Sequence, residues 1–216
     1  MRALLAVLCV AAVAGGAAFA ATGEKEQVHF TKADQAAAKR AVASRADLGS
    51  GAWTGGFVKP DLSAAPTCAN FHPKQSDLVL TGAAESAFDN QGFRIQSEAQ
   101  VLKTHAMVLQ DWKRTVLAPP AIPCLKTHLV KELGSGVTFV SFRRVIFAPV
   151  ATMVQAYTLL VDVKTSTGKV RVALEVVLIG RNRTELTLIS TAPNVAQKIV
   201  AQADAELARA MVARAT

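Results

Sequence analysis

Hydrophobic and polar residues alternate through the second half of the chain, and this pattern predicts strands. Between residues 170 and 178 every second residue is aliphatic, whereas Arg171 and Glu175 occupy the opposite face. Four such segments, each bounded by turn residues, are predicted to be strands at 137–147, 153–164, 170–180 and 184–191. Because connections as short as Arg181-Asn182 join them, we expect consecutive antiparallel hairpins.

The first half of the chain predicts helices and two further strands. Weak alternation predicts strands at 76–81 and 92–102, joined by a long polar connection at 83–90. Capping residues and helical spacing of apolar residues predict helices at 31–44, 104–118 and 123–133, and from Pro193 to near the C-terminus. This order predicts the α+β class, with an antiparallel sheet of about six strands covered by helices on one face.

Residues 51–73 do not show the period of a helix or a strand. The segment is dense in Gly, Pro and Ser, and it also contains Trp53, Phe57 and Phe71. Such a composition is typical of a loop, but the aromatic side chains favour burial. We therefore expect this loop to lie across the surface of the domain.

The N-terminus has the three parts of a secretory signal peptide. Arg2 supplies the positive charge, an apolar stretch follows, and Ala18-Phe19-Ala20 provides small residues before a cleavage site. The expected organisation is a signal peptide at 1–20, a flexible segment and helix at 21–44, and one globular domain at 45–216, secreted or extracytoplasmic. A retained membrane anchor is the alternative, since the apolar stretch continues to Ala21. No other stretch has the length of a membrane span.

Two cysteines remain once Cys9 is removed with the signal peptide. In an exported protein, Cys68 and Cys124 are expected to form one disulfide. A zinc site is the alternative, because His72 and His128 each follow a cysteine by four residues.

The chain is basic, with 24 Lys and Arg against 16 Asp and Glu, a formal net charge of +8. This excess favours anionic partners, or it only keeps the surface soluble. Basic residues are scattered as short pairs and do not interleave with the Trp and Tyr residues, so we do not expect nucleic-acid binding.

The segment from Arg45 to Trp53 reads RADLGSGAW. It resembles the D-L-G-x-G-W type of opening in actinobacterial extracytoplasmic domains, namely the PknH-type sensor domains of receptor serine/threonine kinases and related secreted lipoproteins. The order of elements, and a disulfide joining the early loop to the helical region, are similar to those domains and to the wider PsbP-like fold. The resemblance implies a sensor or carrier with a groove between sheet and helix.

No catalytic motif stands out. The chain lacks G-x-S-x-G, H-E-x-x-H and a Gly-rich phosphate loop, so we expect neither an enzyme nor a cofactor or metal site. The leading expectation is a secreted, non-catalytic domain that binds a small molecule or a lipid-like anion. Apolar residues on the outer face would line the site and arginines would hold the anionic group. The candidate ligand-binding residues are Phe139, Arg143, Tyr157, Val177, Ile179, Arg181 and Arg183.

Two alternatives stay open. The N-terminal helix and the Trp53 loop would cover the same apolar residues if those residues belong to the core. The protein would also fit a structural or protein-interaction role in the cell envelope, with no small-molecule ligand, which predicts a flat apolar patch or an open strand edge.

Overall fold

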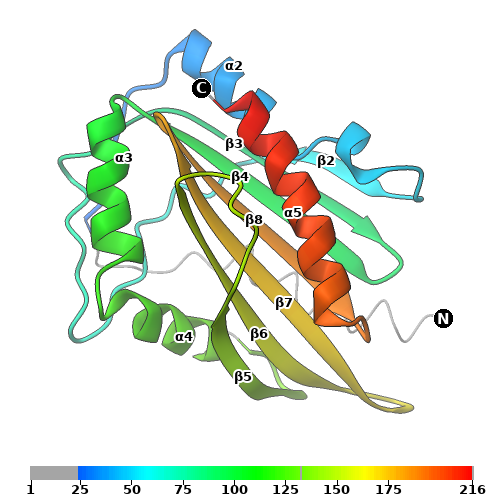
Figure 1. Ribbon diagram of the computed structural model, residues 1–216. Helices are drawn as coiled ribbons and strands as arrows, with labels where there is room; N and C mark the ends of the chain where they lie inside the picture. The colour runs from blue at the N-terminus through cyan, green and yellow to red at the C-terminus, as the bar shows by residue number, and fades with distance from the viewer. Residues whose placement is uncertain (1–23, 132, 216) are drawn as a thin grey trace.

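Eight strands form one open sheet through the middle of the molecule (Figure 1). The computed structural model describes residues 24–131 and 133–215, so the predicted signal peptide lies outside the described residues. The strands are β1 (Gln27–Val28), β2 (Thr54–Val58), β3 (Val79–Asn90), β4 (Phe93–Leu102), β5 (Val137–Val145), β6 (Met153–Thr165), β7 (Gly168–Arg181) and β8 (Thr184–Pro193). Their order is β1-β3-β4-β8-β7-β6-β5, and β2 pairs with the outer edge of β3 next to β1.

The strands β5 to β8 follow the predicted meander of antiparallel hairpins closely. The earlier pair differs from the prediction, because the expected polar connection at 83–90 is the second half of β3. The true turn is Gln91-Gly92, where both residues have positive φ (48° and 99°) as in the tightest hairpins. Alanine and serine dominate 83–90, so this strand gave no clear alternation of apolar and polar residues.

The helices are α2 (Lys32–Ala41), α3 (His105–Asp111), α4 (Ala121–Lys131) and α5 (Gln197–Arg214), with a 3₁₀ turn η2 (Arg45–Leu48) and a π-helical turn η3 (Trp112–Val116). Thr31 and Thr104 cap α2 and α3 through their hydroxyl oxygens, as the sequence predicted. Pro193 does not start the final helix. It ends β8, and α5 begins four residues later.

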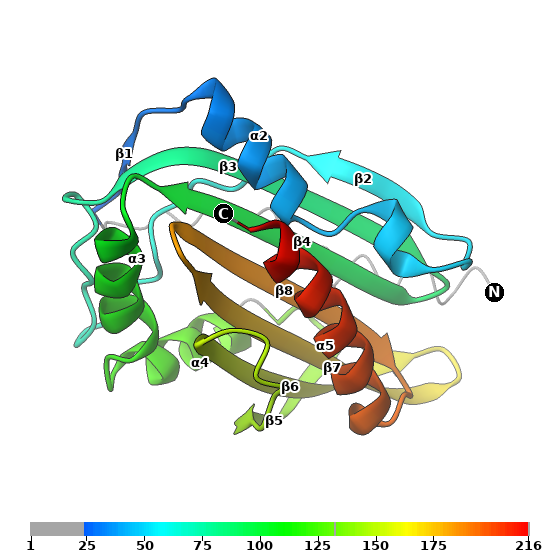
Figure 2. The ribbon, with the colours of Figure 1, turned by 45° about the horizontal axis from the view of Figure 1, so that its top comes forward.

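Helices α2 and α5 cover one face of the sheet, and the chain's C-terminal end lies beside α2 (Figures 1 and 2). Their alanines and Met211 pack on Val177, Ile179 and Leu188, none of which is exposed. At Gly82 a Cβ atom would lie 2.3 Å from the Asp34 carbonyl oxygen, so only glycine lets α2 approach β3 this closely. This face is a filled hydrophobic core.

The other face of the sheet is covered by α3, η3, α4 and the segment 59–78. Alternate residues of a strand point to opposite faces, so Val176 and Leu178 face this second layer while Val177 and Ile179 face α5. The prediction of helices on one face only was therefore wrong, as was the count of about six strands. Apolar residues on both faces of β7 are the physical reason for two covering layers.

The segment predicted as a loop at 51–73 contains the short strand β2. Its aromatic side chains differ in burial: Phe71 packs against α4 and is 7% exposed, whereas Phe57 on β2 is 63% exposed. The loop therefore covers the sheet through its second half, and β2 extends the sheet sideways.

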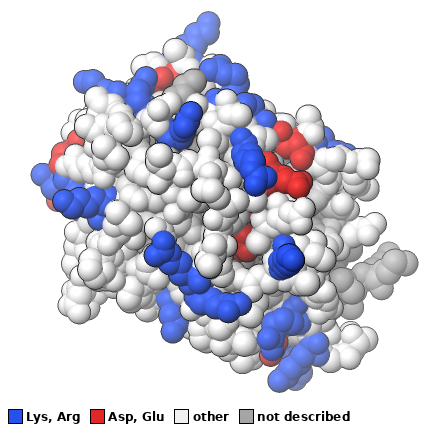
Figure 3. Space-filling model, in the orientation of Figure 1, with Lys and Arg blue, Asp and Glu red and all other residues white. Residues whose placement is uncertain are grey.

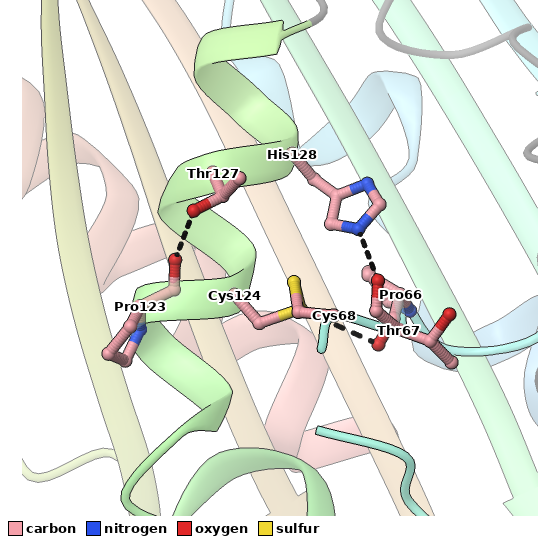
Figure 4. Close-up of a disulfide and its surroundings, with 7 residues drawn as sticks. All are labelled: Pro66, Thr67, Cys68, Pro123, Cys124, Thr127 and His128. Atoms are coloured by element: carbon pink, nitrogen blue, oxygen red, sulfur yellow. Dashed lines mark hydrogen bonds between the residues drawn. A yellow bond between two sulfur atoms is a disulfide. The ribbon is translucent and has the colours of Figure 1, made fainter. Parts of the chain in front are cut away.

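Cys68 and Cys124 form a disulfide, with Cα atoms 5.7 Å apart, that joins the segment 59–78 to α4 (Figure 4). The prediction of this bond is confirmed, and it fits an extracellular protein. His128 lies one turn further along α4, beside the sulfurs, and its Nε2 is 2.9 Å from the Thr67 carbonyl oxygen. Both thiols are consumed by the disulfide and are not zinc ligands in this state.

Within residues 24–131 and 133–215, the structure contains no helix that is long and apolar enough to cross a membrane.

Candidate ligand-binding cavity

A cavity of about 400 Å³ lies between the sheet and the layer made by α3, η3 and α4. Strands β4, β8 and β7 form its floor, and the helices with the segment 59–78 form its roof. The disulfide fastens two parts of that roof to each other. The lining residues are Glu26, Ser63, Ala65, Pro66, Phe71, Gln75, Glu98, Gln100, Asp111, Trp112, Thr115, Val116, Ala121, Leu125, Leu129, Val176, Leu178, Ile179, Glu185, Leu186, Thr187 and Ile189.

One end of the cavity is apolar. Val176 of β7 lies directly opposite Ile189 of β8, and Leu125 and Leu129 of α4 line the same cavity. Leu178, Leu125, Leu129 and Ile189 are all partly accessible, because their free surface faces the cavity. This end suits a hydrocarbon or aromatic group.

The other end is acidic. Gln100 of β4 pairs with Glu185 of β8, and Glu98 pairs with Thr187, so two carboxyls lie on adjacent strands. Asp111, the last residue of α3, and Glu26 beside β1 add two more. The four carboxyls come from four separate segments that only the tertiary fold brings together.

Amides hold part of this acidic end in place. Gln100 Nε2 donates to Glu98 Oε1 at 2.7 Å. Gln75 Nε2 donates to Glu26 Oε1 at 3.2 Å and lies 3.4 Å from Asp111 Oδ1, while its own oxygen accepts from the Ala65 backbone N–H. The side chain of Gln75 thus joins the N-terminal segment, α3 and the covering loop around the cavity.

Burial raises the pKa of all four carboxyls. Desolvation raises the pKa of Glu98 to about 7, against the hydrogen bond from Gln100, and the neighbouring carboxylates add to the rise. Desolvation, followed by repulsion from Asp111, raises the pKa of Glu185 well above its ordinary value. Because Asp111 and Glu185 interact directly, they titrate as a pair.

The described residues that line the cavity include no Lys, Arg or His. The nearest guanidinium in sequence, Arg114, is bonded to Asp77 at 2.6 Å instead, and Asp77 does not line the cavity. Elsewhere the basic side chains are spread over the surface, as the face with α2 and α5 shows (Figure 3). The cavity is thus an acidic interior in a basic protein.

The residues that the sequence proposed for ligand binding lie in separate places. Val177 and Ile179 are fully buried in the core beneath α2 and α5, although Ile179 also borders the cavity. The two candidate aromatic residues contact other neighbours: Tyr157 stacks on Phe142 with ring centroids 5.6 Å apart, and Lys126 lies 5.2 Å from the centre of the Phe139 ring.

The candidate arginines do not converge on a pocket with these residues. Arg183 bonds Asp34 at 2.7 Å and the Leu102 carbonyl, and so ties α2 to the sheet. Arg143 donates to Gln197 at the start of α5, and Arg181 is exposed at the end of β7. Of the seven candidate residues, Ile179 borders the cavity, and the rest of the cavity lining consists of other residues.

The candidate residues proposed from the sequence include neither Glu185 nor Asp111. Both were missed because strand alternation distinguishes two faces but does not say that a face of polar residues will be covered. One signal was present in the sequence: Glu98, Gln100, Glu185 and Thr187 occupy the polar face of β4 and β8, while Trp112 and Val116 needed a surface to pack against.

A second pair of buried carboxyls lies on the opposite face. Glu175 of β7 is 1% exposed and Asp204 of α5 is 3% exposed, and neither lines the cavity. Asp204 accepts a hydrogen bond from Ser190 at 2.5 Å, and the carboxyl of Glu175 interacts with that of Asp204, so the two titrate as a pair. The alternation of β7 places Glu175 on the face opposite Val176 and Leu178, and α5 covers that face.

Comparison with known proteins assigns no family. No family model matches the chain, and no curated protein matches it. Among solved structures, an uncharacterised protein from Mycobacterium smegmatis, the Rv0999 ortholog, is similar over 76% of this chain and 87% of its own, with 13% identity and a TM-score of 0.41. A similarity this distant supports no functional argument, and the resemblance to PknH-type sensor domains and the PsbP-like fold stays a prediction.

Proposed function

We propose that this protein is an exported, non-catalytic binding protein that holds a small molecule in the cavity between the sheet and the α3–α4 layer. The observation that carries the proposal is the cavity itself, about 400 Å³ with one apolar and one polar end. Ligand sites in proteins are commonly clefts or cavities of roughly 300–1,000 Å³ with apolar walls and a few polar groups. This cavity has both properties.

A filled core would have been the alternative use of this layer. The α5 face shows that the chain can pack one side of the sheet tightly, since Leu188, Val177 and Ile179 have no exposed surface. Across the sheet, Leu178 and Ile189 keep accessible surface that faces a cavity. Leaving apolar side chains unpacked costs stability, so retaining the space favours a role in binding.

The test fills the cavity from its apolar end. An uncharged fluorophore, N-phenyl-1-naphthylamine, is titrated into the mature protein and its emission is followed. Leu129→Trp places an indole in the cavity, and we expect it to weaken probe binding about tenfold or more, because the lost volume is comparable to that of one ring of the probe. Leu109→Trp is the matched control, since Leu109 on α3 is 48% exposed and does not line the cavity.

Equal probe affinity in both variants would place the probe on the surface and count against the proposal, as would no binding to the unmodified protein. Native mass spectrometry of protein purified from its own host gives a second measurement. A bound molecule that is retained in Leu109→Trp and lost in Leu129→Trp is the expected result.

A structural or interaction role is the second candidate, and the strand β2 supports it. Among the residues that the structure describes, β2 pairs with β3 alone, and Phe57 and Val58 on it are 63% and 43% exposed. An edge strand with exposed apolar residues suits pairing with another chain. Phe57→Lys would abolish such an association in sedimentation experiments and leave probe binding in the cavity unchanged.

A further inference from the structure

We propose that the cavity selects an organic cation: a protonated amine attached to an apolar body. This inference rests on the proposed function and names its ligand class. It replaces the anion that the basic composition suggested, because the arginines lie elsewhere and the cavity is lined by carboxyls.

The charge of the lining is the first argument. Four carboxyls line one end, and no described lining residue carries a basic group. Like charges in a partly desolvated space repel one another more strongly than in water. Without a cation, the cavity has to hold protons instead, and a bound ammonium group would remove that repulsion directly.

An unsatisfied acceptor is the second argument. Glu185 lines the cavity from β8, and its buried Oε1 has no hydrogen-bond partner among the described residues. A buried acceptor without a donor costs about 1–3 kcal/mol. An ammonium group offers three donors and no acceptor, and so matches a site made of carboxyl oxygens.

The dimensions set the size of the ligand. Glu185 and Ile189 lie on the same face of β8, four residues apart, which corresponds to about 13 Å along the strand. Thr187, opposite Glu98, lies halfway between them. An amine joined to an aromatic ring or a short alkyl chain, about 7–13 Å long, spans from the carboxyls to the pocket formed by Val176 and Leu125.

The spacing of the carboxyls favours an organic cation over a metal ion. Among the described residues, the one group of three potential metal ligands within 4.8 Å of one another is Cys68, Cys124 and His128. No three of the four carboxyls of the cavity lie within 4.8 Å of one another, so they do not form the compact cage of oxygen ligands that Ca²⁺ prefers. Several N–H groups on an organic cation reach such separated oxygens more easily.

The experiment compares three probes of one shape: 2-phenylethylamine, 2-phenylethanol and phenylacetate, each displacing the uncharged fluorophore at pH 7.5. We expect the amine to bind about tenfold more tightly than the alcohol, since a charge-assisted hydrogen bond is about twice as strong as a neutral one, and phenylacetate to bind most weakly. Alcohol or phenylacetate binding as tightly as the amine would overturn the inference.

Two variants assign the effect to the cavity. Glu185→Gln keeps the size of the side chain and removes the charge, and we expect it to lower amine affinity about tenfold while the alcohol changes less than about twofold. Glu175→Gln is the matched control, a buried Glu to Gln change on the opposite face of the same sheet, and we expect it to leave both affinities unchanged.

The possible failures can be told apart. If the fluorophore binds in the cavity but the amine shows no preference over the alcohol, the cation inference fails and the proposed function stands. If the fluorophore does not bind, the proposed function fails and the inference with it. Ca²⁺ or Mg²⁺ alone displacing the fluorophore from the unmodified protein, but not from Glu185→Gln, would identify a metal site and overturn the organic cation.

Discussion

The two faces of the sheet bury acidic side chains in opposite ways. Under α5, Glu175 and Asp204 lie in a filled core with Ser190 as the hydroxyl donor to Asp204. Under α3 and α4, Glu98, Glu185 and two further carboxyls surround a cavity. The same desolvation raises the pKa of both sets. Only the second set has room beside it for a partner other than a proton.

This difference separates a buried acid from a binding site. A carboxyl in a filled core can lose its charge only by binding a proton, so it makes the fold less stable as the pH rises. A carboxyl at a cavity has a second option, because a cationic ligand can enter. Burial and a raised pKa are therefore shared by both faces, and space is the property that distinguishes them.

We expect the largest effect from removing the disulfide, which lies on the cavity side of the sheet and not on the α5 side. Replacing both Cys68 and Cys124 by Ala removes a crosslink with a sequence separation of 56, which should cost up to roughly 4 kcal/mol of unfolding free energy. Urea unfolding measures the loss. Hydrogen exchange should accelerate first in α4 and the segment 59–78, and α5 should stay protected. Faster exchange in α5 than in α4 would show that the two layers are not independent.

We expect the next largest effect from truncating one apolar side chain on each face of the sheet and comparing the two losses of stability. Leu188→Ala removes a side chain with no exposed surface beneath α5 and should cost about 3–4 kcal/mol. Leu178→Ala removes one that already borders the cavity, and should cost about 1–2 kcal/mol because it empties less packed volume. Denaturant melts of both variants give the difference. Equal costs would mean that the cavity side is as tightly packed as the α5 side.

The Glu175–Asp204 pair should make stability depend on pH. Desolvation, with mutual repulsion adding to it, raises the pKa of Glu175 to about 8, and desolvation raises that of Asp204 to about 6, both above their unfolded values. Between the ordinary and the raised pKa values of these two groups, the folded protein therefore binds more protons than the unfolded chain does. Its contribution to stability is complete below about pH 4 and is lost as the pH rises through 6 to 8.

Glu175→Gln should accordingly raise stability by about 1–2 kcal/mol at pH 8 and change it little at pH 5. Thermal melts across this range measure the effect, with Glu206→Gln, an exposed position on α5, as control. A Glu175→Gln variant that is destabilised equally at both pH values would show that the pKa of Glu175 does not differ between the folded and unfolded states.

The smallest expected effect is the pH dependence of amine binding in the cavity. The groups that act on Glu98 and Glu185 are acidic or neutral, namely Glu26, Asp61, Glu85, Asp111 and the Gln100 amide, while Arg114 acts on Asp111 and Lys25 on Glu26. With the pKa of Glu98 at about 7, the site gains negative charge as the pH rises, while the amine stays protonated. Affinity for 2-phenylethylamine should increase about fivefold from pH 6 to pH 8, with the alcohol unaffected. A decrease over this range would contradict the cationic site.

Much of the fold was predictable where one physical signal dominated. Strict alternation located β5 to β8, the hydroxyls of Thr31 and Thr104 marked two helix starts, and export implied the Cys68–Cys124 bond. The second half of β3 was not predictable in this way, because Ala and Ser contribute little hydrophobic contrast. Helix α5 began later than expected because Pro193 is compatible with the last residue of a strand as well as with a helix start, since the pairing of β8 with β4 ends at Thr191.

The candidate site was harder to predict than the fold. A polar strand face usually means solvent, and nothing local in Glu98 or Glu185 indicates that α3 and α4 will cover them. The arginines were predicted to bind the ligand, yet Arg183 forms an ion pair with Asp34 and so joins α2 to the sheet. The cavity brings together residues as far apart in sequence as Glu26 and Ile189, and this information is not present in the periodicity of any one element.

The pairing of β4 with β8 has a consequence for how the chain folds. These neighbours are the most distant in sequence, since Arg94 pairs with Thr191 and Val101 with Thr184, whereas β5 to β8 form a meander of local hairpins. Docking of the β3–β4 hairpin onto that meander is therefore expected to be the slow step. Glu98 and Glu185 approach each other across this seam, so their repulsion opposes docking when they are ionised. Refolding should accelerate as the pH falls from 8 to 6, and a cationic ligand should accelerate it in the same way by joining the two halves of the sheet.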